Sequence, residues 1–487
     1  MHNYKDEIQG KLKSVFGHSQ FRGDQEAIVL GALSGQDSLV LMPTGMGKSL
    51  CFQLPALVGQ GTVLVISPLI ALMQDQVDKA RALGIRATCI HSQISKQERE
   101  ERMAKLGSFQ LVYVTPERFR KPEFVESIKS VKIQLLAIDE AHCISQWGHD
   151  FRPDYSRLGE IRQSLGNPPV MALTASATPQ VQKDILSQLQ MKEAPIYHAG
   201  IERPNLNLQV HDVYGLDEKI RSIVGLRFQT PGSAIVYVSL ISTLYQISQE
   251  LSKLNMDHLI YHGDLGAQER KRNQRLFIEN ENKLIIATPA FGLGVDKPDI
   301  RLLIHAEIPN SIESYYQEIG RAGRDGKESF CHLLLDPDDI SIQMEFIKWA
   351  NPDAGFISQV YSLIEKNQLR LQQEGFDFLR SQMNFYNKRD FRVETAVNIL
   401  ERLGCLTESK GRFPFETVQA PTTEMLDQKQ IDQRLKLQNQ KLLQMVQIAQ
   451  MSTGCRMQEI YKYFGFDHEP CGKCDLCLER QKENPQC

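Results

Sequence analysis

The stretch of sequence that decides the fold is Met42–Ser49, which reads MPTGMGKS. It follows the apolar run Ser38–Leu41 and precedes the apolar run Leu50–Leu54, so a strand, a glycine-bearing loop and a helix start are predicted. Backbone amides at a helix start point toward phosphate oxygens, and a lysine adds positive charge for the β- and γ-phosphates. We therefore predict a nucleotide-binding loop. The residues expected to contact the nucleotide are Thr44, Gly45, Gly47, Lys48 and Ser49.

A second stretch, Asp139–His142, reads DEAH and follows the apolar run Val131–Ile138. Adjacent carboxylates at the end of a buried strand have little structural purpose, but they suit a magnesium–nucleotide complex. Because magnesium is usually held by one or two carboxylates and phosphate oxygens, Asp139 and the Ser49 hydroxyl are predicted magnesium ligands. Glu140 is predicted to orient or deprotonate the attacking water. A glycine–lysine–serine string alone also occurs in structural turns, whereas the two motifs together predict a nucleoside triphosphatase.

The composition is that of an ordinary globular protein. The chain has 487 residues, 41% hydrophobic and 24% charged, and this length predicts about three domains. The formal net charge of −3 carries no global signature of nucleic-acid binding, although a local basic track is sufficient to contact phosphates. Residues 1–7 lack the apolar stretch of a secretory signal, and no run reaches membrane-spanning length. We expect a cytoplasmic location, nucleoid-associated in a bacterium, and no membrane partner.

Short β-rich runs alternate with helical stretches along most of the chain, which is typical of parallel α/β sheets. The alternation covers about residues 35–200, stops at the proline-containing segment Ile201–Asn205, and restarts at Ala234–Val238. The fold class is therefore predicted as α/β, with a nucleotide-binding domain over residues 1–205 and a second domain over residues 206–345. The other predicted strands are Leu39–Leu41, Thr62–Ser67, Leu111–Thr115, Leu135–Asp139, Val170–Thr174, Leu284–Ala287, Leu302–His305 and Phe330–Leu335.

Residues 350–425 lose this alternation and are predicted to be mainly helical, notably over Val393–Gly404. A winged-helix-like insertion and a helical spacer packed against the second domain both fit this composition. Residues 427–452 are rich in Gln, Lys and Leu and predict an amphipathic helix that leads into a cysteine cluster. We therefore expect residues 427–487 to form a helical hairpin and a small metal-binding subdomain.

Ten cysteines are scattered along the chain except near its C-terminus, where Cys455, Cys471, Cys474 and Cys477 cluster. In a reducing compartment such a cluster indicates metal binding rather than disulfides. Four thiolates supply the closed tetrahedral set of a structural zinc site, so these residues are predicted Zn²⁺ ligands. A redox-active pair of cysteines is the alternative.

Several flanking motifs give the chain a more specific resemblance. Two tandem α/β domains with a phosphate loop and a DEAH motif resemble the core of a superfamily 2 helicase, with two RecA-like domains. Phe16–Gln25, which reads FGHSQFRGDQ, is similar to the adenine-reading motif of the RecQ family of DNA helicases. The resemblance implies that Arg22 and Gln25 bind the base of ATP, with His18 in the place of a stacking tyrosine. The cysteine cluster is similar to the zinc subdomain of that family.

A loop after the acidic motif strengthens the resemblance. Cys143–Tyr155 is similar to the aromatic-rich loop of RecQ helicases, which implies coupling of DNA contact to ATP hydrolysis. Its aromatic rings suit unpaired bases, because stacking contributes ~1–3 kcal/mol per base, and an arginine adds a cation. A structural alternative would bury Trp147 in the core. Ala172–Thr178 resembles the family motif that links hydrolysis to domain movement. The loop residues expected to contact or sense DNA are Trp147, His149, Phe151 and Arg152.

The second domain carries two further motifs. Ala287–Pro298 and Gln317–Gly326 are similar to the fifth and sixth motifs of the family. We expect Arg321 and Arg324 at the start of a helix, and the resemblance implies that Arg324 is an arginine finger supported by Arg321, acting on the γ-phosphate across the interdomain cleft. The chain departs from the family pattern in two segments, which puts individual DNA-phosphate contacts there in doubt. These are Ser239–Thr243 and Tyr261–Asp264.

The resemblance covers roughly residues 10–345 and 430–480. It implies a monomeric ATP-dependent helicase that moves 3′ to 5′ on single-stranded and partly duplex DNA in repair or recombination, with single-strand-binding protein or recombination factors as partners. Because the sequence stops at Cys487, we expect a short form without the C-terminal winged-helix and HRDC domains. The alternatives are an RNA helicase, against which the aromatic loop argues, and a DNA-stimulated translocase that remodels DNA or protein–DNA complexes without processive unwinding.

Overall fold

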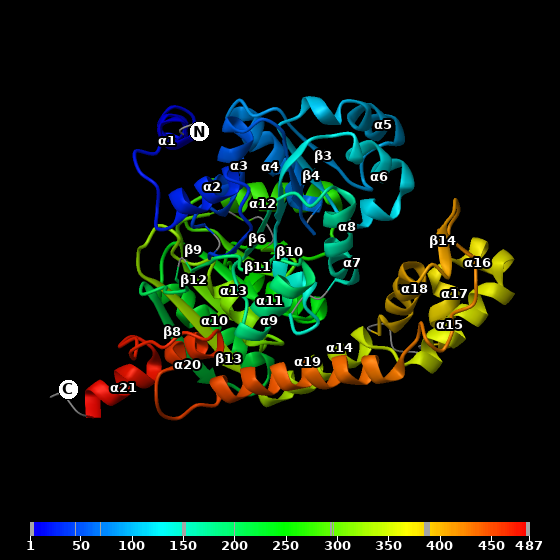
Figure 1. The fold of residues 1–487 in the computed structure, drawn as a ribbon. Coiled ribbons are helices and arrows are strands. Elements are labelled where there is room, and N and C mark those ends of the chain that lie inside the picture. Colours follow the sequence, from blue (N-terminus) through cyan, green and yellow to red (C-terminus); the bar gives the residue numbers. More distant parts are fainter. Residues whose placement is uncertain are drawn as a thin grey trace. The chain divides into compact units, whose positions relative to one another are not determined.

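The computed structural model describes residues 4–43, 45–68, 70–148, 152–198, 200–292, 295, 297–383 and 390–483. The chain forms two compact units. One unit comprises Met1–Glu307, Glu313–Leu334 and Ile448–Cys487, and the other comprises Ile308–Ile312 and Leu335–Gln447. The first unit contains both parallel sheets and the cysteine-bearing subdomain (Figure 1).

Among the described residues the first sheet contains seven strands in the order β3-β4-β2-β5-β6-β1-β7, and neighbouring strands run parallel. Most strand residues are buried on both faces, because helices cover both sides of the sheet. This is why the strands are continuous apolar runs. The strands are β1 (Ser38–Leu41), β2 (Thr62–Ile66), β3 (Ala87–Ile90), β4 (Leu111–Val114), β5 (Ile133–Ile138), β6 (Val170–Thr174) and β7 (Ile196–His198).

Alternate residues of these strands enter two separate cores. Val40 belongs to a core with Ile28 and Phe52, whereas the adjacent Leu41 belongs to a core with Phe124 and Ile185. The first core lies under α2 (Gln25–Leu33), α3 (Lys48–Val58) and α4 (Ile70–Ala82), with α1 (Tyr4–Ser14) beside α3. The second lies under α6 (Pro122–Lys129), α8 (Leu158–Ser164) and α9 (Pro179–Gln188); α5 (Lys96–Ala104) and α7 (Pro153–Ser156) complete the domain.

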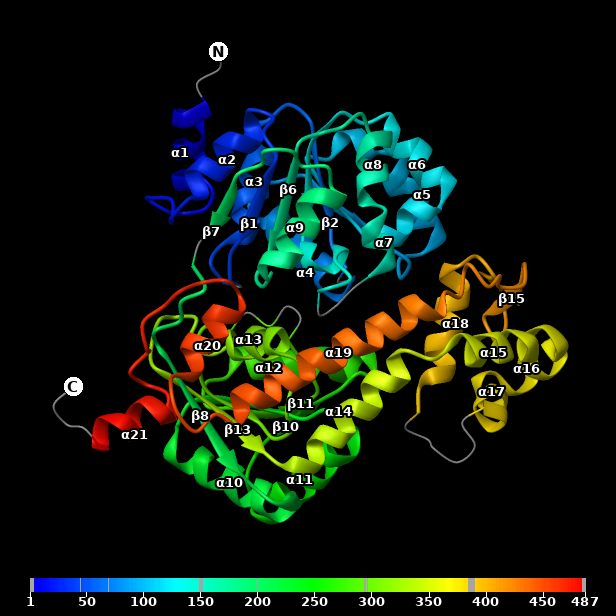
Figure 2. The ribbon, with the colours of Figure 1, turned by 60° about the horizontal axis from the view of Figure 1, so that its bottom comes forward.

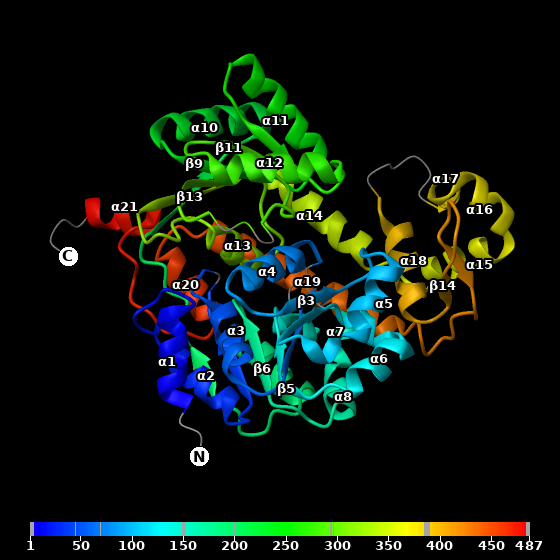
Figure 3. The same cartoon turned by 90° about the horizontal axis from the view of Figure 1, so that it is seen from above.

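The second sheet, in the described part of the chain, contains six strands in the order β10-β11-β9-β12-β13-β8. Figure 3 shows α10 and α11 on one face, and α12 and α13 on the other. The predicted architecture of two tandem parallel-sheet domains is therefore confirmed. The elements are β8 (Leu206–Asp212), α10 (Gly215–Gln229), β9 (Ser233–Tyr237), α11 (Ile241–Lys253), β10 (Leu259–Tyr261), α12 (Ala267–Glu279), β11 (Leu284–Ala287), β12 (Ile300–His305), α13 (Ile312–Ile319) and β13 (Ser329–Leu335).

The second unit is built on two helices that lie side by side, α14 (Pro337–Ala350) and α19 (Gln428–Ala449) (Figure 2). Asn351 Nδ2, at the end of α14, donates to Gln438 Oε1 of α19 over 2.5 Å. A mainly helical insertion between them has its own core, as predicted, and it also contains an antiparallel strand pair. Its elements are α15 (Ala354–Lys366), α16 (Gln368–Glu374), α17 (Phe376–Met383), α18 (Arg392–Arg402), β14 (Leu406–Glu408) and β15 (Phe415–Thr417).

The C-terminal part of the first unit contains α20 (Arg456–Tyr463) and α21 (Asp475–Glu483). Arg456 is buried, and its guanidinium binds Asp475 over 2.8 Å and donates to the carbonyl of Ala449 over 3.0 Å. Asp475 also accepts from the backbone N–H of Val210 in β8 over 3.0 Å, which fixes this subdomain to the second sheet. None of the described helices combines the length and the apolarity needed to cross a bilayer.

Candidate ATPase and zinc sites

The predicted phosphate loop joins β1 to α3. Gly45 and Gly47 have φ values of 87° and 88°, which residues with side chains rarely adopt. Space is also tight at Gly47, where a Cβ would lie 2.7 Å from Gln25 Nε2. Because α3 begins at Lys48, its first amides are available to an anion. Thr44, also predicted to contact the nucleotide, lies outside the described residues.

The ammonium group of Lys48 fits a bound phosphate. Its Nζ atom is buried, and within the described residues it has no hydrogen-bond partner. Burying an ammonium without a partner is unfavourable, and phosphate oxygens would accept from its N–H groups. The next residue, Ser49, has its Oγ 3.5 Å from Gln76 Oε1. This donor set fits ATP with Mg²⁺, as predicted.

Gln25 connects the segment before α2 to the phosphate loop. Its Oε1 accepts from the backbone N–H of Arg22 over 3.0 Å, and its Nε2 donates to the carbonyl of Met46 over 3.1 Å. The side chain is buried, whereas His18 and Arg22 are exposed. Both polar atoms of Gln25 therefore have protein partners in this structure. A role of these three residues in binding the base remains a prediction.

The two acidic residues lie directly after β5. Glu140 has a φ of 49°, so the chain turns sharply between the strand and the following 3-10 helix. Burial, together with the charge of Glu140, raises the pKa of Asp139 to about 6, and Lys48 opposes this shift. A magnesium ion would favour the charged form of Asp139. The geometry therefore suits a carboxylate that becomes fully ionised when it binds a cation.

His142 connects the acidic motif to the predicted coupling motif Ala172–Thr178. Its Nδ1 lies 3.4 Å from Glu140 Oε2 and 3.0 Å from Thr174 Oγ1. Thr174 Oγ1 in turn accepts from the backbone N–H of Ser176 over 3.3 Å. A displacement of the coupling motif would therefore move a ring that contacts the predicted water-orienting carboxylate.

Hydrogen bonds of Ser145 hold the start of the aromatic-rich loop in place. Ser145 Oγ donates to Asp184 Oδ2 over 2.5 Å and accepts from the backbone N–H of Trp147 over 3.1 Å. Gly148 has no room for a side chain, since a Cβ there would lie 2.4 Å from the carbonyl oxygen of His142. The backbone that carries Trp147 is thus held against the acidic motif.

Trp147 does not belong to the core, because 49% of its side chain is exposed. Arg152, at the other end of the loop, donates to the carbonyl of Pro68 over 3.1 Å. His149 and Phe151 lie outside the described residues. The arrangement leaves the indole ring open to a stacked base, and the DNA-contacting role of these four residues remains a prediction.

Trp147→Ala is expected to reduce stimulation of ATP hydrolysis by single-stranded DNA about 5- to 150-fold, the equivalent of one lost stacking contact, and to leave DNA-independent hydrolysis unchanged. Trp349→Phe is the matched control, because the only other tryptophan of the chain is 6% exposed. That control also leaves Trp147 as the sole indole, so its fluorescence should be quenched by single-stranded DNA. If single-stranded DNA stimulated hydrolysis by Trp147→Ala as strongly as by the native protein, Trp147 would have a structural role instead.

The sequence-based placement of Arg321 and Arg324 at the start of a helix is wrong. Helix α13 ends at Ile319, and both arginines lie in the turn that follows it. Within this turn Gly323 has a φ of 57°, a conformation that favours glycine. Arg321 is buried and donates to the carbonyl of Gly292.

Arg324 lies beside the phosphate loop of the first sheet. A Cβ built on Gly45 would lie 3.2 Å from Arg324 Cδ, and Arg324 Nη1 donates to the carbonyl of Val295 over 2.9 Å. The second sheet thus contributes a cation next to the loop predicted to hold the phosphates. This position suits the predicted arginine finger, and the assignment stays a prediction.

Two further residues, not identified from the sequence, support this turn. Arg203 and Asn205, interpreted only as part of a linker, donate to the carbonyls of Gly320 and Gly323. Their partners lie more than 100 positions away, so no local spacing could have indicated these contacts. A buried hydrogen bond between His305 Nε2 and Glu318 Oε2, 2.7 Å apart, was also missed.

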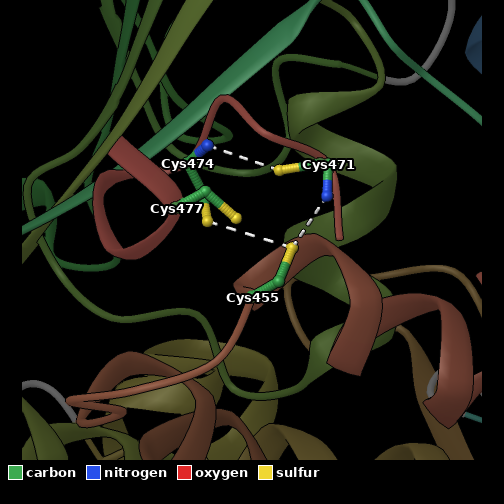
Figure 4. A group of neighbouring side chains, drawn as sticks. All are labelled: Cys455, Cys471, Cys474 and Cys477. Atoms are coloured by element: carbon green, nitrogen blue, oxygen red, sulfur yellow. Dashed lines mark hydrogen bonds between the residues drawn. The ribbon is translucent and has the colours of Figure 1, made fainter. Parts of the chain in front are cut away.

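The four predicted zinc ligands come together (Figure 4). Cys455 precedes α20, whereas Cys471, Cys474 and Cys477 lie on the loop before α21 and on its first turn. The four Sγ atoms all lie within 4.8 Å of one another, which suits zinc, since tetrahedral Zn–S bonds of about 2.3 Å place sulfurs about 3.8 Å apart. Backbone N–H groups of Cys471 and Cys474 donate to the Sγ atoms of Cys455 and Cys471 over 3.2 and 3.3 Å. The predicted structural zinc site is supported, rather than a redox pair.

Comparison with known families gives matches in all three regions. Residues 22–185 match the family described as DEAD/DEAH box helicase, and residues 217–326 match the helicase conserved C-terminal domain. Residues 420–478 match the family described as RecQ zinc-binding. The helicase core and the zinc subdomain predicted from the sequence are thus both present in the chain.

Curated relatives extend this likeness over the whole chain. The chain is 37% identical to a probable ATP-dependent DNA helicase RecS of Bacillus subtilis, over 98% of this chain and 94% of the relative. It is 33% identical to an ATP-dependent DNA helicase RecQ of Synechocystis, over 97% and 98%. RecQ of Bacillus subtilis is 44% identical, over 70% of this chain and 58% of the relative.

Solved structures share the fold at lower identity. The helicase MrfA bound to DNA is 16% identical, with a TM-score of 0.57, over 86% of this chain and 64% of that one. Mss116p bound to single-stranded RNA and AMP-PNP is 15% identical, with a TM-score of 0.57, over 82% and 92%. The fold alone is therefore common to DNA- and RNA-bound proteins, whereas the sequence relatives are more specific. The chain belongs to the RecQ family of ATP-dependent DNA helicases.

Proposed function

We propose that this protein is an ATP-dependent DNA helicase that moves 3′ to 5′ on single-stranded DNA and unwinds duplexes during repair or recombination. The observation that carries the proposal is the approach of Arg324, from the second sheet, to the phosphate loop of the first sheet. A site completed by both sheets makes hydrolysis depend on their relative position. Repeated closing and opening would then advance the two sheets along a strand, with Trp147 as the contact that senses DNA.

The DNA partner and the cellular setting are part of the same proposal. Single-stranded and partly duplex DNA are the expected substrates, the active form is a monomer, and the protein works in the cytoplasm, at the nucleoid in a bacterium. Single-strand-binding protein or recombination factors are the expected protein partners. The relatives' names support DNA rather than RNA as the nucleic acid.

Strand separation on a 3′-tailed duplex, measured beside ATP turnover with single-stranded DNA, duplex DNA and RNA, tests this proposal. Unwinding together with DNA-selective turnover is the expected result. A 5′-tailed duplex is the matched control and should remain paired. Selective turnover with RNA would contradict the choice of nucleic acid.

A DNA-stimulated translocase without processive unwinding is the second candidate. The β14–β15 hairpin of the insertion favours it, because its turn is tied down rather than free to separate strands. Phe413 is fully buried, its carbonyl accepts from Gln372 Nε2 over 3.0 Å, and Arg412 Nη1 donates to the carbonyl of Gln373 over 2.7 Å. Turnover and movement along DNA without strand separation would support this candidate.

Lys48→Ala is expected to lower ATP turnover about 100-fold or more, because the variant loses a cation that stabilises the charge of the transferred phosphoryl group. The melting temperature of the nucleotide-free protein should change little, since the variant loses a buried ammonium without a hydrogen-bond partner but also loses its attraction for Asp139. Turnover and thermal unfolding measured on the same preparation check both expectations. If Lys48→Ala kept its ATP turnover, the assignment of the phosphate loop would be wrong.

A further inference from the structure

The segment between the two sheets holds the turn that carries Arg321 and Arg324. Arg203 lies between β7 and β8, and its Nη1 donates to the carbonyl of Gly320 over 2.8 Å. Its Nη2 donates to the carbonyls of Ala322 over 2.5 Å and of Gly323 over 3.2 Å. One guanidinium therefore satisfies three carbonyls of the turn that follows α13.

A second side chain of the same segment holds the turn from its other side. Asn205 Nδ2 donates to the carbonyls of Gly323 and Lys327, each over 2.8 Å. Gly323 is confined as well, because a Cβ there would lie 2.4 Å from Asn205 Nδ2. The path of the turn is therefore fixed by contacts with the segment between the sheets.

The zinc subdomain holds Arg203 itself. The hydroxyl of Tyr461, in α20, accepts from the backbone N–H of Arg203 over 2.9 Å. Tyr461 is 3% exposed and lies six residues after the zinc-binding Cys455. The hydroxyl of Tyr316, in α13, donates to the carbonyl of Ile201, so the segment is held at a second point.

We propose that Arg203 is a positioning residue for ATP hydrolysis, which fixes the turn bearing Arg321 and Arg324 and is itself held by Tyr461 of the zinc subdomain. The inference rests on the proposed function and assigns the zinc subdomain a part in hydrolysis beyond its own folding. A charged group that acts on a transferred phosphoryl group must be well placed, since a displacement of about 1 Å can cost about 100-fold in rate. The planar fork of arginine suits several carbonyls at once, whereas lysine offers a single centre of charge.

Arg203→Ala is expected to lower kcat for DNA-stimulated ATP hydrolysis about 10- to 100-fold and to change KM for ATP less than about threefold. We expect kcat to change more than KM, because Arg203 acts on the turn of the second sheet, whereas the phosphate loop belongs to the first. Arg203→Lys should recover part of kcat, since one or two of the carbonyls remain within reach of an ammonium. Steady-state kinetics on the full chain, with saturating single-stranded DNA, measures all three values.

Arg162→Ala is the matched control. Arg162 also donates to three carbonyls, those of Pro168, Leu189 and Gln190. It binds the carboxylate of Asp37 as well, over 2.8 Å, and it lies in α8 with none of these partners in the predicted ATP site. Both alanine variants should lower the melting temperature, whereas only Arg203→Ala should lower kcat. An equal loss of kcat in the two variants would assign the effect to general destabilisation and overturn the proposal.

Hydrogen exchange provides a readout that does not depend on activity. Backbone N–H groups of Gly320, Arg321 and Gly323 donate to other backbone carbonyls, so they should exchange slowly in the native protein. Arg203→Ala should speed exchange over residues 319–327 about tenfold or more, and Arg162→Ala should leave it unchanged. Unchanged exchange in Arg203→Ala overturns the positioning role, whatever the turnover. If Arg203→Ala speeds exchange but the native protein has no ATP turnover, the proposed function is wrong, whereas the contact between Arg203 and the turn is supported.

Tyr461→Phe tests the part of the zinc subdomain, because it removes one hydroxyl and leaves the ring and the cysteines in place. We expect kcat to fall about three- to tenfold, zinc content to stay unchanged, and the effect to vanish in the Arg203→Ala background. Independent, multiplicative losses in the double variant would overturn the link between Tyr461 and Arg203.

Discussion

Arg324→Ala is expected to lower DNA-stimulated ATP turnover about 1000-fold, because arginine fingers contribute about 10³- to 10⁵-fold to phosphoryl transfer and Arg324 is the predicted finger. Arg324 Cδ lies 3.2 Å from the place a Cβ would take on Gly45, so its side chain lies next to the loop predicted to hold the phosphates. Affinity for ATP should change only a few-fold, since Lys48 and the loop amides remain. Steady-state turnover and titration with a fluorescent ATP analogue measure the two quantities.

Arg227→Ala is the control for this variant. Arg227 belongs to the same domain and donates to the carbonyls of Thr230, Gly232 and Asn282. These three residues lie before the N-terminal ends of strands β9 and β11, not after their C-terminal ends. Arg227→Ala should lower the stability of the protein. Its ATP turnover should stay unchanged at temperatures where the protein is folded. Full turnover in Arg324→Ala would transfer the predicted role to Arg321.

Cys474→Ser should abolish stoichiometric zinc binding and unfold the C-terminal part of the first unit. A structural zinc site supplies about 10–16 kcal/mol of apparent binding free energy, which exceeds what this small subdomain could recover from its own core. We expect one zinc per native chain by elemental analysis, a large fall in zinc content in the variant, and rapid proteolysis between residues 453 and 483. The subdomain is expected to unfold because Cys474 is fully buried at the centre of the cluster.

Cys331→Ser serves as the matched control. This cysteine is also fully buried, but it lies in β13 and outside the cluster. The variant should keep its zinc and show only the modest loss of stability expected from a buried hydroxyl. A native protein that is folded and resistant to protease without zinc would contradict the four-cysteine site.

The fold was predictable wherever local sequence carries its own signal. Val170–Thr174 and Leu284–Ala287 are apolar runs buried on both faces, and each strand has the predicted bounds. Ile196–His198 and Leu259–Tyr261 were not predicted, because three partly exposed residues form too short a run to stand out. Their strand conformation comes from pairing with a neighbour that is already in place.

The candidate sites follow the same division. The local sequence indicates the chemistry of two features. These are the four cysteines at metal-binding spacing and the lysine at the end of a glycine loop. The sequence around Arg203 gives no such signal, because its guanidinium binds backbone carbonyls, which every residue has whatever its side chain. The position of Arg321 was predicted wrongly for a related reason, since the local apolar pattern does not show that α13 ends at Ile319, before both arginines.

The insertion of the second unit leaves and rejoins the α14–α19 pair at neighbouring points. The backbone N–H of Ala354, at its start, donates to Gln428 Oε1, at its end, over 2.9 Å. A connection of about two to eight residues, the usual length between adjacent helices, could therefore replace residues 354–427 without re-routing the chain. The module is built as an exchangeable cassette. Its exchange for a short connection would leave the two helices at its base, and the rest of the chain, with the same path.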